Sequence, residues 1–169
     1  MGRSRGGLTT KIHVLADRRC RALVRLTSAG QRHDSKAFLP VLRRLRIARR
    51  GPGRPRTRPH RLLGDKAYSN RQVRSYLRRR RIIATIPEKA DQIAHRAKQG
   101  SRGGRPPAFD PIAYRDRNTT ERAFNKLKAF RAVALRTDKR DYVYRGTIDV
   151  ATIKIWLRDP VRHDLSDTP

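Results

Sequence analysis

One amphipathic stretch, residues 114–128 (YRDRNTTERAFNKLK), constrains the fold of this chain more than any other. An α-helix turns by about 100° per residue, which brings four of its side chains within about 60° of one another: Tyr114, Arg117, Glu121 and Lys128. Apolar residues fall on the neighbouring arc, where they can pack against a core. The pattern predicts a helix with one carboxylate among cations and a phenol. Such a carboxylate can hold a metal ion against a phosphate, but a solvated surface helix has the same periodicity.

The net charge of the chain limits the classes of partner that it can bind. Its 169 residues include 43 Lys and Arg against 14 acids, a formal net charge of +29. Such a field favours a polyanion, of which nucleic acid is the commonest. A membrane surface is the weaker alternative, because the most apolar segment, 148–157, is too short and too polar to span a bilayer and no signal peptide is evident. The single cysteine, Cys20, excludes an internal disulfide and fits a reducing cytosol, where we expect a structural thiol.

The first third of the chain predicts four segments, which are a basic arm, the two strands of a hairpin and a helix: residues 1–7, 8–16, 21–27 and 36–45. We expect Asp17 to lie in the hairpin turn. Residues 28–35 form a loop, in which Asp34 or Ser35 can cap the helix.

The remainder predicts two strands and three helices: strand 61–64, helix 71–80, strand 82–86, main helix 111–132 and closing helix 142–157. Two Pro- and Gly-containing segments, 48–60 and 88–110, are expected to lack regular structure. Asp110 should cap the main helix, and Pro111 should occupy its first turn. The arginines of 48–60 suit a loop that tracks DNA, although a solvated insertion explains them equally well. Residues 159–169 read as a tail.

Strands that lead into helices, after an antiparallel pair, predict an α/β fold with one mixed sheet. Strand 82–86 is apolar throughout and therefore expected at the centre of the sheet. Asp65 follows strand 61–64 directly and precedes a turn into a helix. Sheets of this class bind ligands at such strand ends, although a plain turn or capping acid is common there too.

Several kinds of chemistry are excluded by the residues present. The five histidines lack metal-ligand spacing and cysteine partners, and no glycine-rich loop matches a nucleotide motif. Carboxylates with divalent cations remain, and Asp65 and Glu121 are the best placed among the acids. Two Mg²⁺ ions about 3.5–4 Å apart can clamp the attacking and leaving oxygens of a phosphoryl displacement, provided that acids bridge them.

Six blocks of the chain stand out together: GRSRGGLTTKIH (2–13), the GQxHD run (30–34), LLGDKAY (62–68), GRPPAFD (104–110), the helix with Tyr114, Arg117, Glu121 and Lys128, and RTDK (136–139). In this order they resemble the DDE transposases of bacterial insertion sequences, in the branch with a Tyr-Arg-Glu-Lys signature. The resemblance covers nearly the whole chain and is highly specific.

The resemblance implies a ribonuclease-H-like mixed sheet flanked by helices, and cleavage at transposon ends followed by strand transfer from the freed 3′-hydroxyl. Asp65 matches the second acid of the triad and Glu121 the third, so both would bind Mg²⁺ or Mn²⁺ in a two-metal site. Tyr114, Arg117 and Lys128 match contacts to the DNA end and its phosphates. The implied partners are double-stranded DNA at transposon ends and target, and a homo-oligomer is compatible. The implied location is the cytoplasm, at the nucleoid, without a membrane.

The chain departs from the family pattern at one point. The first catalytic Asp of the family lies upstream of the GRSRGG block, and with it the first strand, so residues 8–158 correspond to a catalytic domain lacking both. Asp17 and Asp34 are at the wrong places to substitute. We therefore expect a C-terminal fragment, either the downstream frame of a two-frame gene or a decayed copy, and the upstream frame product becomes a partner.

Two other functions fit the same charge. A ribosomal or architectural protein would bind nucleic acid without a catalytic site. An inactive remnant, or a regulator, would bind transposon ends without cutting them. Salt-dependent DNA binding does not distinguish these from a transposase, because all of them contact phosphates.

Overall fold

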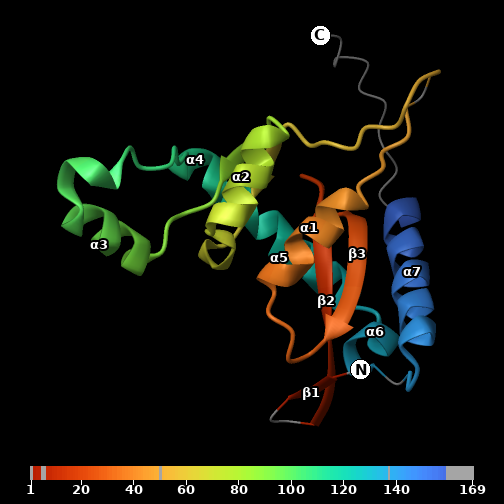
Figure 1. The fold of residues 1–169 in the computed structure, drawn as a ribbon. Coiled ribbons are helices and arrows are strands. Elements are labelled where there is room, and N and C mark those ends of the chain that lie inside the picture. The colour runs from red at the N-terminus through yellow and green to blue at the C-terminus, as the bar shows by residue number, and fades with distance from the viewer. Residues whose placement is uncertain (1, 5–6, 50, 137, 159–169) are drawn as a thin grey trace.

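The computed structural model describes residues 2–4, 7–49, 51–136 and 138–158. Its strands are β1 (Gly2–Ser4), β2 (Gly7–Ala16), β3 (Ala22–Ala29), β4 (Arg61–Leu63) and β5 (Ile83–Thr85). Its α-helices are α1 (Ser35–Arg43), α2 (Arg71–Arg79), α3 (Ala90–Lys98), α4 (Pro111–Tyr114), α5 (Asn118–Lys128), α6 (Arg131–Leu135) and α7 (Asp141–Arg158). Short 3-10 turns are η1 (Lys66–Tyr68), η2 (Gly100–Gly103) and η3 (Arg115–Arg117). Figure 1 shows this α/β arrangement, which confirms the expected class. The expected tail, 159–169, lies outside the described residues.

The β2–β3 hairpin forms as predicted, in antiparallel register. Asp17 holds its turn, because its carboxylate accepts hydrogen bonds from the backbone N–H groups of Arg19 and Arg21 and from the Arg21 side chain. The hairpin is longer than expected, since Ala29 still pairs with β2. Gly2–Ser4, in the segment expected to be an arm, forms β1 and pairs antiparallel with the start of β2.

The single mixed sheet is a wrong prediction, because the described strands form two separate sheets. One holds β1, β2 and β3 in that order, and the other holds β4 and β5 as a parallel pair. The strand expected at the centre, β5, therefore has β4 as its one strand partner among the described residues, and its Ile83 is 43% exposed. No described strand bridges β2 and β4, so the apolar character of β5 reflects packing against helices rather than a central place in a sheet.

The side chains of β2 divide the core between two groups of helices. Ile12 and Val14 pack on the cluster formed by α5, α6 and α7, while Leu15 packs on α1 and the β4–β5 unit. Successive side chains of a strand point to opposite faces, so one strand serves both clusters. Leu77 of α2 and Ile148 of α7 are fully buried, one in each group. The β2–β3 hairpin therefore packs against both groups of helices.

The helix predictions need three corrections. The main helix is interrupted by η3, and it ends at Lys128, because the backbone of Phe130 turns to an extended conformation and α6 starts anew. The segment 88–110 contains α3, whose Ala, Gln, Arg and Lys residues are strong helix formers. Asp34 makes no capping bond to α1, since its carboxylate pairs with Lys11 instead.

The predicted capping of the main helix is confirmed, because the Asp110 carboxylate accepts from the backbone N–H of Ala113 at 2.9 Å and Pro111 opens α4. The closing helix forms as α7. No helix in the described part of the chain is long and apolar enough to cross a membrane.

Candidate active site

Asp65 lies where the sequence places it, directly beyond the carboxyl end of β4. Its backbone is extended, and its carbonyl accepts the Tyr68 N–H at 2.9 Å, which closes the η1 turn. The residue is exposed, and its side chain makes no capping bond. Burial raises the pKa of the Tyr68 phenol, and the charges of Asp34 and Asp65 raise it further. The carboxylate of Asp65 therefore projects from a fixed turn.

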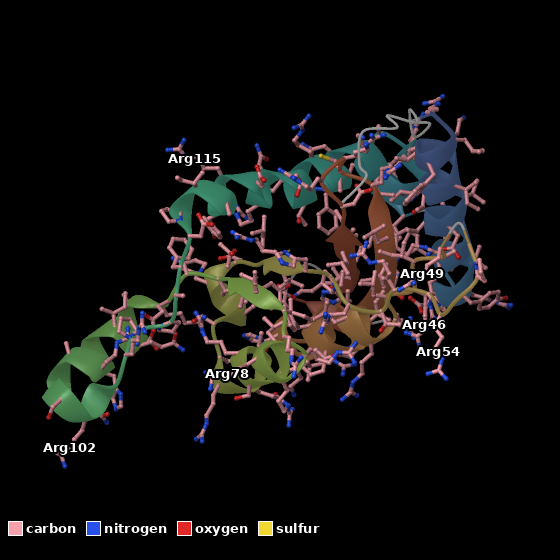
Figure 2. All side chains as sticks on the ribbon, turned by 90° about the horizontal axis from the view of Figure 1, so that it is seen from above. Arg46, Arg49, Arg54, Arg78, Arg102 and Arg115 are labelled. Carbon is pink, nitrogen blue, oxygen red and sulfur yellow. The ribbon has the colours of Figure 1, made fainter. Side chains whose placement is uncertain are left out.

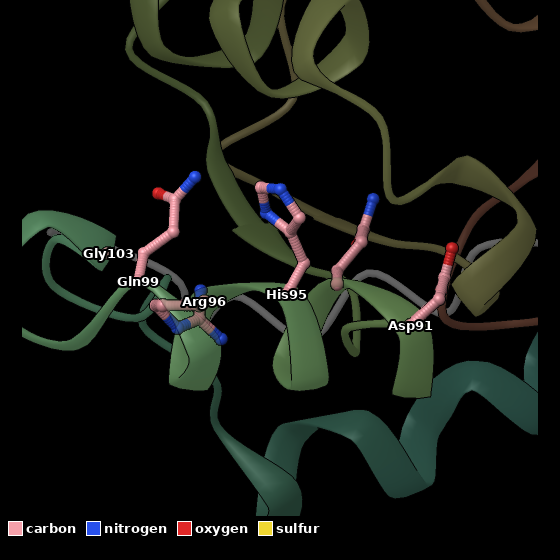
Figure 3. A pocket seen from close by; sticks show the side chains of 6 residues that line it. Asp91, His95, Arg96, Gln99 and Gly103 are labelled. Atoms are coloured by element: carbon pink, nitrogen blue, oxygen red, sulfur yellow. The ribbon is translucent and has the colours of Figure 1, made fainter.

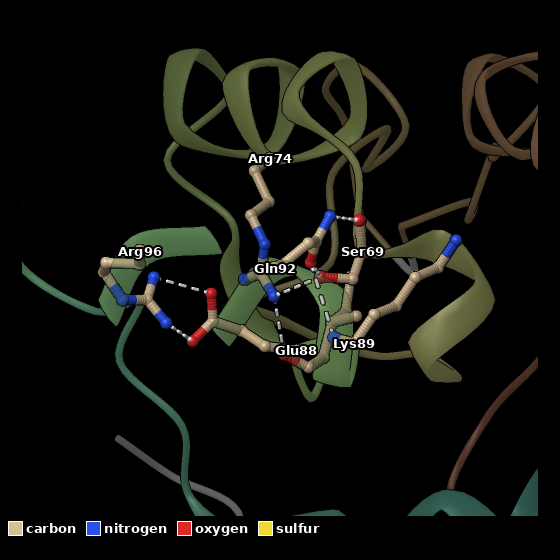
Figure 4. Close-up of polar contacts among 7 residues, drawn as sticks. Ser69, Arg74, Glu88, Lys89, Gln92 and Arg96 are labelled. Atoms are coloured by element: carbon tan, nitrogen blue, oxygen red, sulfur yellow. Dashed lines mark hydrogen bonds and ion pairs between the residues drawn. The ribbon is translucent and has the colours of Figure 1, made fainter. Parts of the chain in front are cut away.

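A part-buried network of side chains behind Asp65, centred on the buried Ser69, fixes that turn. The Ser69 hydroxyl donates to the Gln92 side-chain oxygen at 2.8 Å, while the Gln92 amide donates back to the Ser69 carbonyl at 2.5 Å. Arg74 donates to the Ser69 hydroxyl and to the Ile86 carbonyl, both at 2.9 Å. Figure 4 shows how these bonds join the turn to α2 and α3. Ser69 is 1% exposed, so water cannot replace these partners.

Polar contacts at the N-terminal end of α3 adjoin the same network. Glu88 forms a two-pronged ion pair with Arg96, and the pair lowers the pKa of the Glu88 carboxyl through the hydrogen bond to Arg96. Figure 4 shows this pair beside Gln92. Since α3 has no buried residue of its own, these polar bonds attach it to the molecule.

One cavity lies away from both acids. It measures about 490 Å³ and is lined by one face of α3 and η2, with Asp91, His95 and Gln99 among its residues (Figure 3). Asp65 and Glu121 do not line it, and both residues are exposed. An open surface suits a ligand larger than a small molecule.

Glu121 lies in the first turn of α5. It accepts a hydrogen bond from the Arg117 guanidinium at 2.5 Å, one helical turn away. The Arg117 guanidinium lies 5.9 Å from the ring centre of Tyr114, and that ring lies 5.2 Å from the ring of Phe109. Three signature residues therefore meet in one chain of contacts, although η3 interrupts the helix that carries them.

An ion pair holds the strand of Asp65 against the helices of Glu121. Arg61, at the start of β4, contacts Asp110, at the start of α4, with an N–O distance of 2.5 Å. From this point the strand covers about 13 Å to Asp65, and the helices cover about 16 Å to Glu121. The ion pair thus fixes where the strand that leads to Asp65 starts relative to the helices that lead to Glu121.

The charges that act on Arg117 include both candidate acids. Burial lowers the pKa of the Arg117 guanidinium, but its hydrogen bond to Glu121 and the charges of Glu121, Tyr114 and Asp65 outweigh burial and raise the pKa above its usual value. The pKa of Arg117 therefore reflects the charges of both carboxylates. Lys128 is exposed in the last turn of α5, about 10 Å further along the helix than Glu121.

The donor chemistry fits a hard divalent cation in kind but not in number. Carboxylate oxygens are the ligands that Mg²⁺ and Mn²⁺ prefer. Among the described residues, however, no group of three His, Cys, Asp or Glu side chains could hold a metal ion. Asp17 and Asp34 do not fill the gap, since they pair with Arg21 and Lys11. Asp65 and Glu121 would supply two carboxylate ligands to such an ion.

Sequence reasoning missed the residues that support the two acids. Ser69, Gln92 and Arg74 join segments 23 and 5 residues apart, and Arg61 meets Asp110 across 49 residues. No periodicity signals such pairs. The one available hint was the scarcity of acidic residues in the middle of the chain. Residues 35–87 hold 17 Lys and Arg, and Asp65 is the single acid among them.

Comparisons with known proteins indicate the family of the chain. The family model described as a transposase DDE domain matches residues 2–147. A candidate transposase for insertion sequence element IS6501 of Brucella ovis is 40% identical over 52 residues, which are 31% of this chain and 40% of that relative. The match thus spans less than half the length of the curated relative. No solved structure is significantly similar to the chain. Since the family model covers most of its length, the chain belongs to the family of transposase DDE domains.

Proposed function

We propose that this chain takes part in DNA transposition by cleaving DNA at the ends of an insertion sequence and joining the freed end to a target. The observation that carries the proposal is the ion pair of Arg117 with Glu121, beside which the charge of Asp65 also raises the pKa of Arg117. Carboxylates near one another can supply the ligands that metal-assisted phosphoryl transfer needs.

The roles follow from the geometry. Asp65 and Glu121 would hold a divalent cation, which would polarise the scissile phosphate and activate a water or a 3′-hydroxyl. Arg117 keeps Glu121 oriented and offers its remaining N–H donors to a phosphate oxygen. Lys128, about 10 Å along the helix, reaches a neighbouring phosphate of the same strand. Tyr114 supports Arg117 from below through its ring.

The two separate sheets support a ribonuclease-H-like fold completed by one further strand. Such a strand would lie between β2 and β4 and would turn the two sheets into one. It would also bring the missing metal ligand, because strand ends at this place adjoin Asp65. We propose that a segment encoded upstream provides both, as part of the same protein or as a separate frame product.

The DNA path is suggested by the distribution of arginines. Figure 2 shows Arg46, Arg49 and Arg54 projecting from the loop after α1, with Arg78 on the same side of the molecule. The loop is fastened to the end of α2, because the Arg80 side chain donates to the carbonyl of Thr57 at 3.2 Å. A duplex that follows these residues gains from counterion release.

The test is metal-dependent nicking of a duplex that carries the insertion-sequence end, by the chain together with its upstream segment. We expect nicking with Mg²⁺ or Mn²⁺, and at least a ~10³-fold loss in Glu121→Gln. The matched control is Asp91→Asn, which alters an exposed carboxylate of α3 and should still cut. DNA affinity is measured in parallel, and nicking that survives Glu121→Gln contradicts the proposal.

A second candidate function is a regulator or remnant that binds transposon ends without cutting. The incomplete set of metal ligands in the described part of the chain favours it for the isolated polypeptide. Binding of end duplex in the absence of nicking, with and without the upstream segment, would support this function over catalysis.

A further inference from the structure

Helix α7 has an apolar face that the molecule does not use. Its inner face is buried against β2, α5 and α6, with Tyr144, Ile148 and Ile155 nearly inaccessible. Its outer face points away from the body at the edge of the molecule (Figure 1). Large apolar side chains nevertheless populate that outer face: Val143, Val150, Ile153 and Leu157 are 41%, 67%, 59% and 76% exposed.

These residues have the spacing of a helix-pairing seam. With Gly146 they recur at intervals of 3, 4, 3 and 4 residues, which keeps them within about 80° of one another on the helix. A Cβ added at Gly146 would meet no atom within 4 Å, so another backbone can approach there. We call Val143, Gly146, Val150, Ile153 and Leu157 the α7 seam. A helix that is apolar on opposite faces is normally covered on both.

The charges beside the seam favour a second copy of this chain as its cover. Helix α7 carries two acids and three cations, so its net charge is about +1, whereas the nine residues of α2 include four arginines and no acid. Most of a chain with net charge +29 repels its own copies. The α7 seam is one place where two copies can meet without that repulsion.

The flanking charges also select an orientation. In a parallel pair of helices, a residue on one flank faces the residue five positions later on the partner. Asp149 on one flank would face Lys154 of the other copy, and the two-fold symmetry would create this contact twice. An antiparallel pair centred on Val150 would instead place the two Asp149 carboxylates on the same flank. Asp149 already pairs with Arg25 and keeps 42% of its side chain exposed, so it can accept a second cation.

From these observations we infer that the α7 seam pairs in parallel with the same seam of a second copy, forming a two-fold dimer. Five seam positions over four turns bury less than the roughly 1,200 Å² of a standard interface. The dimer is therefore reversible, with a dissociation constant in the micromolar range or weaker. This inference does not depend on catalysis.

Sedimentation equilibrium tests the association. Between about 10 μM and about 500 μM, the chain should change from monomer to dimer, and added salt should strengthen the dimer by screening the repulsion. Ile153→Lys should weaken association at least ~10-fold, because it places a charge in the seam. The matched control is Ile112→Lys on α4, which alters a residue that is 77% exposed and should leave association unchanged. A chain that stays monomeric throughout overturns the inference.

Disulfide trapping tests the orientation. The native Cys20 is buried, so a cysteine introduced on the seam is the reactive one. Val143→Cys and Leu157→Cys should each form a disulfide-linked dimer under mild oxidation, whereas Ile112→Cys should not. A disulfide that forms only when the Val143→Cys and Leu157→Cys chains are mixed shows antiparallel pairing and contradicts the parallel dimer. The absence of any crosslink in all mixtures means that the seam binds something other than a second copy.

Discussion

The two candidate acids are held in opposite ways. Asp65 stands on a turn whose backbone is fixed by buried side chains, while its own carboxylate makes no capping bond. Glu121 stands on a helix at the surface, and a neighbouring guanidinium holds its carboxylate directly. The difference concerns what must move when a ligand binds. The Asp65 turn is already ordered, whereas a metal ion would have to compete with Arg117 for the Glu121 carboxylate.

This contrast explains why a single surface can be both stable and reactive. The fixed turn costs nothing on binding, because its order is already established in the core. The Arg117–Glu121 pair is exposed on one side, and exposed pairs are weak enough to rearrange. A substitution at Arg117 should therefore act on function, and a substitution at Ser69 should act on stability.

The largest predicted effect tests whether the two acids form one unit. Asp65→Asn and Glu121→Gln should each lower nicking by at least ~10³-fold in the protein completed by its upstream segment. The double variant should be no worse than either single variant, since the site is already lost. Single-turnover cleavage rates check this, and losses that multiply in the double variant would show that the acids act at separate places.

A smaller effect is predicted for Arg117→Gln. Because Arg117 orients Glu121, its loss should lower nicking by ~10–100-fold, while the free energy of unfolding changes by less than about 1 kcal/mol. Arg122→Gln is the matched control, one exposed arginine on the same helix, and should retain most activity. Equal losses in both variants would mean that Arg117 contributes charge alone.

The turn of Asp65 should respond in stability instead. Ser69→Ala removes a buried hydroxyl that bonds Gln92 and Arg74, and should lower the free energy of unfolding by about 1–3 kcal/mol. Ser75→Ala, on α2 and outside this network, should change it by less than about 0.5 kcal/mol. Urea denaturation followed by circular dichroism measures both. Equal stabilities would mean that the network does not fix the turn.

The smallest predicted effect is on the pH dependence of stability, through the Asp110 carboxylate that pairs with Arg61. The backbone N–H of Ala113 and then the Arg61 guanidinium hold the pKa of Asp110 below its usual value of 3.8. The stabilisation by this carboxylate is complete above that value and disappears as pH falls through the lower, folded-state pKa. Asp110→Asn keeps the helix cap, but its side chain cannot titrate. The free energy of unfolding of this variant should therefore fall less on acidification than that of the unchanged protein. Thermal melts between about pH 5 and pH 2 check this, and identical pH profiles would contradict it.

Local patterns predicted much of this molecule, while long-range contacts did not follow from them. Period-two alternation predicted β2 and β3, and the Asp110–Pro111 pair predicted the start of α4. The residue types of the hairpin turn predicted the place of Asp17. The single sheet was wrong, because whether β1–β3 and the β4–β5 pair join into one sheet depends on neighbouring strands and not on composition. Helix α3 was missed because its anchor Gln92 acts through Ser69, which lies 23 residues earlier in the chain.

The candidate site divides in the same way. The helical stripe predicted that Arg117 lies next to Glu121, which the ion pair confirms. The position of Asp65 beyond a strand was also confirmed. The tie between Arg61 and Asp110 spans 49 residues and could not be derived from spacing. The catalytic roles of these residues stay predictions.

The most direct test of the shared acid site is iron-directed cleavage of the polypeptide. Fe²⁺ with ascorbate generates radicals beside the bound ion, and the cut positions report which backbone segments are adjacent. The account predicts cuts near both Asp65 and Glu121, suppressed by excess Mg²⁺ and abolished at both places by either Asp65→Asn or Glu121→Gln. Cuts near one acid alone, or cuts that survive at the other acid after one is replaced, would contradict it.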